Sequence, residues 1–223
     1  MSKKRIVVSI ALNSLLLLVL MRATVNLLVI SAIDSADYWN KFFDMIIRAE
    51  NIIPMILSII TLFYIISLFH SLISKNDTAR WINVLRLIFS ASQIVIALIA
   101  LCVISPYNGE FRFLNPTYGK EYSLDYYLFI AIPLLTLISF IPTRNEYSAF
   151  GLLYGNIVVV LYLAIIIILY VTNIIALPVD YKFMDVLVQG YYKPIINMVI
   201  IIAGTTMVSG ILMLMSRPRG EQI

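Results

Sequence analysis

The sequence predicts an all-α, polytopic membrane protein with six transmembrane helices in a single domain, residues 1–223. Composition is the first reason: 61% of the residues are hydrophobic and 13% are charged, whereas an ordinary globular chain has roughly 25% charged residues. The second reason is the length of six apolar runs, because a bilayer core is crossed by roughly 20 apolar residues. These runs are continuously apolar rather than alternating, which favours helices over the strands of a membrane barrel.

The predicted spans cover about 6–33, 51–73, 87–105, 126–142, 150–177 and 195–215. The first follows the charged start "MSKKR" and has an apolar part that is too long for a signal peptide. No small-x-small cleavage site follows it, so we expect an uncleaved first span. The second, fourth and sixth spans carry Pro54, Pro133 and Pro194 near their starts, where a helix tolerates proline.

The third span contains the single cysteine, Cys102, which excludes an intrachain disulfide and a cysteine metal site. The fifth span opens on "GLLYG", in which Gly151 and Gly155 have the small-xxx-small spacing that lets apolar helices pack closely. With one histidine in the chain and no clustered acids in the spans, we expect no metal ion and no cofactor.

The distribution of charge predicts that both termini lie in the cytoplasm. With the N-terminus inside, the cytoplasmic segments hold an excess of basic residues, namely Lys3, Lys4, Arg5, Lys75, Arg80, Arg86, Arg144, Arg217 and Arg219. The loops on the other side then carry more acids than bases, as the positive-inside rule requires. The net charge of +4 is consistent with this orientation and with some attraction to anionic lipid headgroups. It gives no reason to expect nucleic acid as a partner.

Arg22 is the most costly residue for a membrane span, because arginine at a helix centre costs roughly 2.5 to 3.5 kcal/mol on insertion scales. Asn26 lies one turn later on the same face. Two interpretations stay open: a buried Arg22 paired with Glu50, Asp44 or Asp185, or a shifted span that brings Arg22 to the outer interface.

One stretch before the last span, "FMDVLVQGYYKPIIN" at 183–197, is similar to a family motif that runs approximately F-L-D-V-x-x-x-G-Y-x-x-V-x-x-N. The residues that match in register are Phe183, Asp185, Val186, Gly190, Tyr191 and Asn197. The chain thus resembles a prokaryotic six-transmembrane family related to the animal androgen-induced and androgen-dependent membrane proteins. The resemblance implies a six-helix fold and descent from intramembrane hydrolases of fatty acid esters of hydroxy fatty acids, which use a threonine and a histidine.

The positions of that catalytic pair are replaced in this chain. The stretch "FFDMIIRAEN", residues 42–51, aligns with the family's threonine segment and has Ile47 at the nucleophile and Glu50 at a second threonine. The stretch "DYYLFIAIP" keeps Asp125 and Pro133 of the histidine segment but has Phe129 at the histidine. Because isoleucine and phenylalanine supply neither a nucleophile nor a base, the resemblance implies a relative that has lost the chemistry.

We therefore expect a non-catalytic membrane protein that binds a lipid or acyl ligand or a partner membrane protein, with a homo-oligomer as a further possibility. The alternatives are an active lipid-ester hydrolase with a shifted catalytic set, such as Glu50 with Arg22, and a small transporter. The candidate ligand residues are Arg22, Asn26, Asp44, Arg48, Glu50, Asn51, Asp125, Asp185, Tyr191 and Asn197. The expected location is the cell membrane, and frequent Ile, Asn, Lys and Tyr are compatible with a bacterial cytoplasmic membrane.

Overall fold

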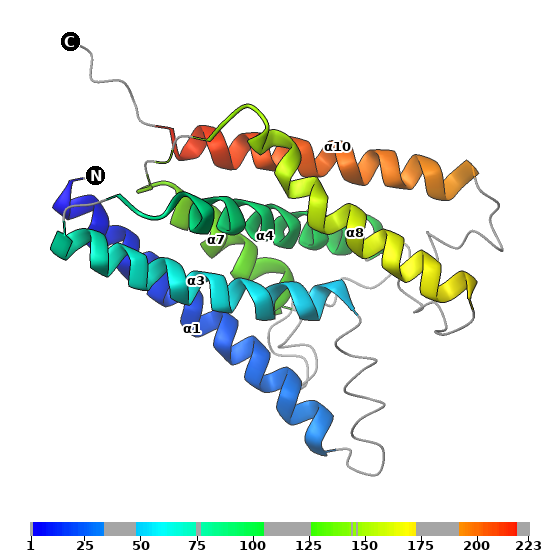
Figure 1. Ribbon diagram of the computed structural model, residues 1–223. Coiled ribbons are helices and arrows are strands. Elements are labelled where there is room, and N and C mark those ends of the chain that lie inside the picture. The colour runs from blue at the N-terminus through cyan, green and yellow to red at the C-terminus, as the bar shows by residue number, and fades with distance from the viewer. Residues whose placement is uncertain are drawn as a thin grey trace.

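The computed structural model describes residues 2–33, 48–74, 77–104, 126–143, 145, 147–172 and 192–217. All of its secondary structure in these ranges is helical (Figure 1). The elements are α1 (Lys3–Ile33), α3 (Ala49–Ser74), α4 (Arg80–Ile99), η2 (Ala100–Ile104), η4 (Tyr127–Ala131), α7 (Ile132–Phe140), α8 (Gly151–Val171) and α10 (Tyr192–Met215).

Five of these helical segments are long and apolar enough to cross a membrane, namely Lys3–Asn26, Ala49–Ser74, Arg80–Cys102, Gly151–Val171 and Ile195–Met215. The chain is thus a multi-pass helical membrane protein. The fourth predicted span, 126–142, forms a shorter apolar helix, Tyr127–Phe140.

Two boundaries differ from the predicted spans in a way that matters for function. Helix α4 begins at Arg80, whereas the predicted third span began near residue 87. Arginine is a good helix former, so the helical hydrogen bonds continue through the charged residues. Arg86, which the prediction assigned to a cytoplasmic segment, therefore lies inside the helix. The fifth helix ends at Val171, before the predicted end at 177, and residues 173–177 lie outside the described part of the chain.

Helices that follow one another along the chain run in opposite directions. The starts of α1 and α4 lie toward the left of Figure 1, together with the ends of α3, α7 and α10, and α8 begins nearer the top centre of the view. A backbone bond from the Asn145 N–H to the Ser216 carbonyl, 3.0 Å long, joins the segment before α8 to the end of α10 at this side. We call it the N-terminal end of the bundle.

Helix α4 lies at the centre of the bundle. It contacts α3, α7, α8 and α10, and 61% of its most apolar stretch is buried, against 44% or less in the other four long segments. Its residues take part in three apolar clusters: Ala97 packs with Leu16 and Leu57, Leu87 packs with Leu212, and Ile82 packs with Tyr64. The outward faces of α1, α8 and α10 keep large exposed apolar residues, as lipid-facing helices do.

Proline accounts for the irregular start of the short helix α7. In a π-helix a carbonyl accepts from the N–H five residues on, as the Tyr127 carbonyl does from Ile132. In that register the Leu128 carbonyl would need the N–H of residue 133, which is a proline and has none. The side-chain nitrogen of Gln93, fully buried on α4, donates to this carbonyl at 2.9 Å instead.

We expect Gln93→Leu to lower the free energy of unfolding by about 1–2 kcal/mol, because it leaves the Leu128 carbonyl without its donor. The loss is limited because the substitution also removes the buried Gln93 Oε1, which has no hydrogen-bond partner within the described ranges. In a Pro133→Ala background the loss should shrink, since the alanine introduced there has an N–H that can donate to the Leu128 carbonyl. Thermal unfolding of the wild type, the two single variants and the double variant in nanodiscs measures this double-mutant cycle. Equal losses from Gln93→Leu in both backgrounds would contradict the role given to Pro133.

Candidate ligand-binding site

Much of the predicted ligand site lies where the structure gives no description. Ile47, which occupies the position of the family's threonine, is outside the described ranges. So are four candidate ligand residues: Asp44, Asp125, Asp185 and Tyr191. The outer-loop part of the predicted site therefore stays a prediction.

Phe129, at the position of the family's histidine, lies within a packed apolar cluster. Its side chain is 8% exposed and belongs to a group of buried residues that also includes Leu20, Leu57 and Ala100. Apolar side chains thus enclose this position. A histidine there would have to be buried beside these apolar groups, and burying a polar side chain is costly unless it is hydrogen-bonded.

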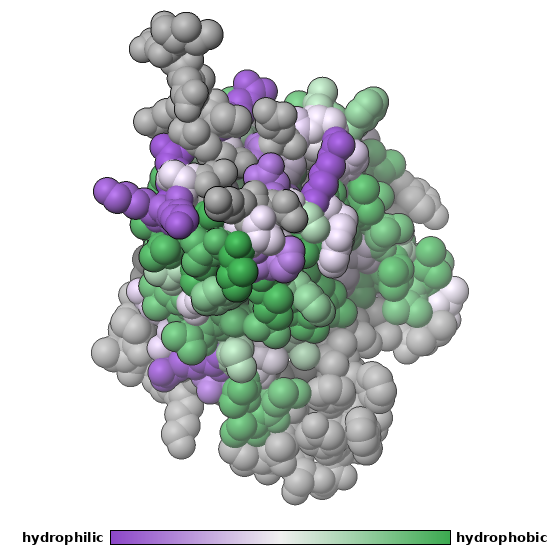
Figure 2. All heavy atoms as spheres, turned by 60° about the vertical axis from the view of Figure 1, so that its left-hand side comes forward, coloured by the Kyte–Doolittle hydropathy of each residue, from purple (hydrophilic) through white to green (hydrophobic). Residues whose placement is uncertain are grey.

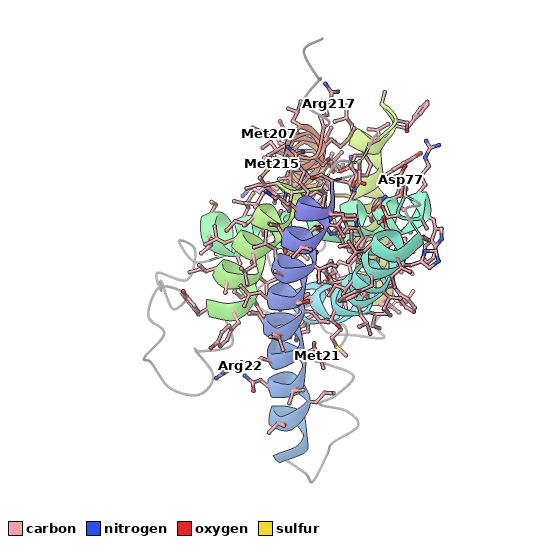
Figure 3. The ribbon with its side chains drawn as sticks, turned by 90° about the vertical axis from the view of Figure 1, so that its left-hand side faces the viewer. Met21, Arg22, Asp77, Met207, Met215 and Arg217 are labelled. Atoms are coloured by element: carbon pink, nitrogen blue, oxygen red, sulfur yellow. The ribbon has the colours of Figure 1, made fainter. Side chains whose placement is uncertain are left out.

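Arg22 is exposed on α1 and is not buried in the bundle. Within the described residues its contact is the ring of Tyr127, whose centroid lies 5.2 Å from the guanidinium carbon. Figure 3 places Arg22 on the half of α1 far from its N-terminus, with Asp77 near the other end of the bundle. The buried pair of the first interpretation is not seen among the described residues, where a cation–π contact takes the place of an acid.

The remaining described candidates are distributed over three helices, α3, α1 and α10. Arg48 and Glu50 are half-buried and Asn51 is buried at the start of α3, where the Ala49 N–H donates to the Tyr162 hydroxyl at 2.8 Å. Asn26 is half-buried on α1, and Asn197 is half-buried on α10. The described part of the chain shows no ion pair between Arg22 and Glu50, and the shifted hydrolase set stays a prediction.

The structure places an open cleft of about 910 Å³ at the N-terminal end of the bundle, within the usual range for small-molecule sites. Its apolar wall is formed by Ile6, Leu68, Trp81, Val84 and Leu85, and its polar residues are Ser71, Asp77, Thr78, Arg80, Asn83, Asn145, Tyr147, Ser148 and Tyr154. Hydrophilic residues gather among hydrophobic ones in the upper part of Figure 2, which turns this end toward the reader.

Helix α4 also carries a buried arginine, which is not itself a lining residue of the cleft. Arg86 is 1% exposed and follows Asn83, a lining residue, by one helical turn. Its Nη2 donates to the Ser139 carbonyl at 3.0 Å and to the Ser139 hydroxyl at 2.7 Å. Its guanidinium carbon lies 4.2 Å from the ring centroid of Tyr64 and 4.1 Å from that of Phe140. The two rings and the negative end of α7 stabilise the charge.

These contacts leave the charge of Arg86 only partly satisfied. Among the described residues, its buried Nη1 has no hydrogen-bond partner and no carboxylate pairs with the guanidinium. Tyr147, which lines the cleft, is close enough for its phenol to interact with the guanidinium. Burial raises the pKa of Tyr147, against a smaller opposing effect of Arg86, so the phenol stays a neutral donor.

A pattern in the sequence marks this polar interior. Asn83, Arg86, Ser90 and Gln93 are spaced by three, four and three residues and are all buried on one face of α4, as helical geometry requires. This spacing is the signal that could have located Arg86 inside the bundle. Charge counting hides it, because it groups Arg86 with the flanking loop charges.

No catalytic or metal constellation stands out in the described part of the chain. Ser74 Oγ lies 3.2 Å from His70 Nδ1, but both residues are exposed, and the serine also donates to the His70 carbonyl at 2.8 Å. Two exposed side chains on one helix do not make the enclosed, oriented pair that a nucleophile and its base form. Within the described residues there is also no group of three His, Cys, Asp or Glu side chains that could hold a metal ion.

Comparison with known proteins gives no match: no protein-family model, curated protein or solved structure resembles the chain significantly.

Proposed function

We propose that the chain is a non-catalytic protein of the bacterial cytoplasmic membrane that binds an amphiphilic lipid in the cleft at the N-terminal end of the bundle. In this proposal six helices cross the membrane with both termini in the cytoplasm, so the cleft opens at the inner leaflet. The fold of the fatty-acid-ester hydrolases, suggested by the motif at 183–197, supplies the scaffold.

The observation that carries the proposal is the composition of the cleft. Leu68 and Val84 form an apolar wall beside Asn83, Arg80 and Ser71, so one ligand with an acyl chain and a polar head fits both parts. A site at the end of a helical bundle in a membrane protein is also open to lipid arriving from the bilayer. A wholly soluble metabolite would leave the apolar wall without a partner.

The absence of chemistry is supported by the surroundings of Phe129, which lies in a packed apolar cluster. Wild-type protein in nanodiscs should not hydrolyse a panel of lipid esters that includes esters of hydroxy fatty acids, as read by mass spectrometry. An Ile47→Thr, Phe129→His double variant is tested beside it for a gain of activity. Turnover by the wild type that is lost in Glu50→Gln would replace the proposal with the hydrolase alternative.

Lipid binding is tested by filling the cleft. We expect Val84→Trp to reduce lipid retained by the purified protein at least about five-fold in native mass spectrometry, because the larger ring occupies the apolar wall. Val199→Trp is the matched control, since Val199 on α10 is 60% exposed and lies outside the cleft lining. Equal lipid retention by Val84→Trp and the wild type would contradict binding at this cleft.

Transport is a second candidate function, favoured by the buried polar face of α4 from Asn83 to Gln93. Buried polar and ionisable residues within membrane spans often mark the paths of solutes or ions. This face begins at the cleft and ends beside the π-helical start of α7. Solute flux in proteoliposomes that disappears in Gln93→Leu would favour transport over retention of a lipid.

A further inference from the structure

Four helices of the bundle form a closed ring of contacts. Helix α1 contacts α3, α3 contacts α4, α4 contacts α7, and α7 contacts α1. All four contribute polar side chains that are at most 1% exposed, which we call the polar layer: Asn13, Thr61, Arg86, Ser90, Thr136 and Ser139. Such a layer needs hydrogen-bond partners, because an unsatisfied polar atom that is buried costs stability.

The polar layer lies between two apolar clusters. One cluster has Tyr64 in it and Ile10 packed against it, and the other contains Leu16 and Leu57. On α1, Asn13 lies about one helical turn from each of its two flanking cluster residues, and on α3, Thr61 lies between the other two. Because α1 and α3 run in opposite directions and are in contact, Asn13 and Thr61 lie at the same level of the bundle.

Arg86 reaches this level from α4. Its guanidinium carbon lies 4.2 Å from the ring centroid of Tyr64, which follows Thr61 by about one turn of α3. Its Nη2 donates to Ser139 on α7. The serine and threonine side chains of the layer are also smaller than the leucine and isoleucine side chains of the two clusters. They therefore fill less of the space between the four helices.

Three atoms of the polar layer have no hydrogen-bond partner among the described residues: Asn13 Oδ1, Thr61 Oγ1 and Arg86 Nη1. They come from three different helices. Arg86 Nη1 can only donate, Asn13 Oδ1 can only accept, and the Thr61 hydroxyl can do either. A buried water molecule typically makes about three hydrogen bonds to groups of this kind, and it can both accept and donate.

We propose that the polar layer binds water molecules, which accept from Arg86 Nη1 and donate to Asn13 Oδ1 and Thr61 Oγ1. The water satisfies these atoms and hydrates the buried guanidinium charge. The site is distinct from the lipid cleft, which is lined on α1 and α3 by Ile6 and Leu68, about two helical turns from Asn13 and Thr61. The inference therefore does not rest on lipid binding.

Radiolytic labelling of the full-length protein in nanodiscs tests this proposal, because hydroxyl radicals formed from bound water oxidise the side chains beside it. Phe140 is 0% exposed and packs on Arg86, whereas Phe129 is 8% exposed and lies in an apolar cluster. We expect Phe140 to be labelled at least about three-fold faster than Phe129, against the order of their exposure, because water is bound beside it. In an Asn13→Leu, Thr61→Val double variant, labelling of Phe140 should fall to the rate of Phe129.

Thr205→Val is the matched control. Thr205 is also 0% exposed, but it lies on α10 and its hydroxyl donates to the Ile201 carbonyl at 2.7 Å, so labelling of Phe140 should not change. Thr61→Val alone keeps the shape of the side chain and replaces the double variant if that variant does not fold. Labelling of Phe140 no faster than that of Phe129 would overturn the water site. A rate that Thr61→Val leaves unchanged, or that Thr205→Val lowers equally, would overturn its assignment to these residues.

Discussion

Replacing Arg86 with alanine should lower the free energy of unfolding by about 3 kcal/mol. The change removes a side chain stacked between Tyr64 and Phe140 and leaves a cavity between two rings. It also removes the two hydrogen bonds to Ser139, and bonds from a charged donor are stronger than neutral ones. Thermal unfolding in nanodiscs measures the loss.

Arg86→Met separates packing from charge. Methionine fills the space between the rings and removes a charge that no described carboxylate neutralises, so we expect its stability to stay within about 1 kcal/mol of the wild type. Arg22→Ala is the control, because Arg22 is exposed, and should change stability by less than about 0.5 kcal/mol. A methionine variant as unstable as the alanine variant would show that the hydrogen bonds, and not packing, dominate at this position.

The second large effect is expected at Gly155, where three helices meet. A Cβ atom built there would overlap Ser209 Oγ of α10 and would lie 3.1 Å from Ala91 Cβ of α4 and 3.2 Å from Thr205 Cγ2. Gly155→Leu therefore has to push α8 away from α4 and α10. We expect a loss of about 3 kcal/mol or more, at the upper end of overpacking costs.

Gly204→Leu is the matched control, because a Cβ at Gly204 has nothing within 4 Å. It should keep or slightly raise stability, since leucine is a better helix former than glycine. Both variants are compared by thermal unfolding and by the yield of folded protein. Similar behaviour of the two leucines would mean that α8 does not depend on close approach at Gly155.

The sequence predicted the helices well because bilayer length and apolar runs constrain them strongly. The small-xxx-small spacing of Gly151 and Gly155 is common in apolar helices, so the close approach of α8 to α4 and α10 at Gly155 is a finding of the structure. The short helix α7 was less predictable, because its π-helical start depends on Pro133 together with Gln93 from another helix. Such a pairing leaves no local pattern.

The site was predicted less well, and for a physical reason. Charge counting treats every arginine near an apolar run as part of a loop, and this placed Arg86 outside the membrane span. Its burial depends on Ser139, Tyr64 and Phe140, which are contributed by two other helices. No single stretch of sequence contains that environment. The polar spacing along α4 was the available clue, and it requires looking for a polar face within an apolar helix.

The position of Arg86 also has a consequence for biogenesis. Helix α4 is synthesised before α7, so during insertion the guanidinium has Tyr64 of α3 as a neighbour but not yet Ser139 or Phe140. An arginine without those partners raises the cost of leaving the translocon. We therefore expect α4 to stay beside α3 at the translocon until α7 has been synthesised. Insertion of α3, α4 and α7 would then be a concerted event and not three independent insertions.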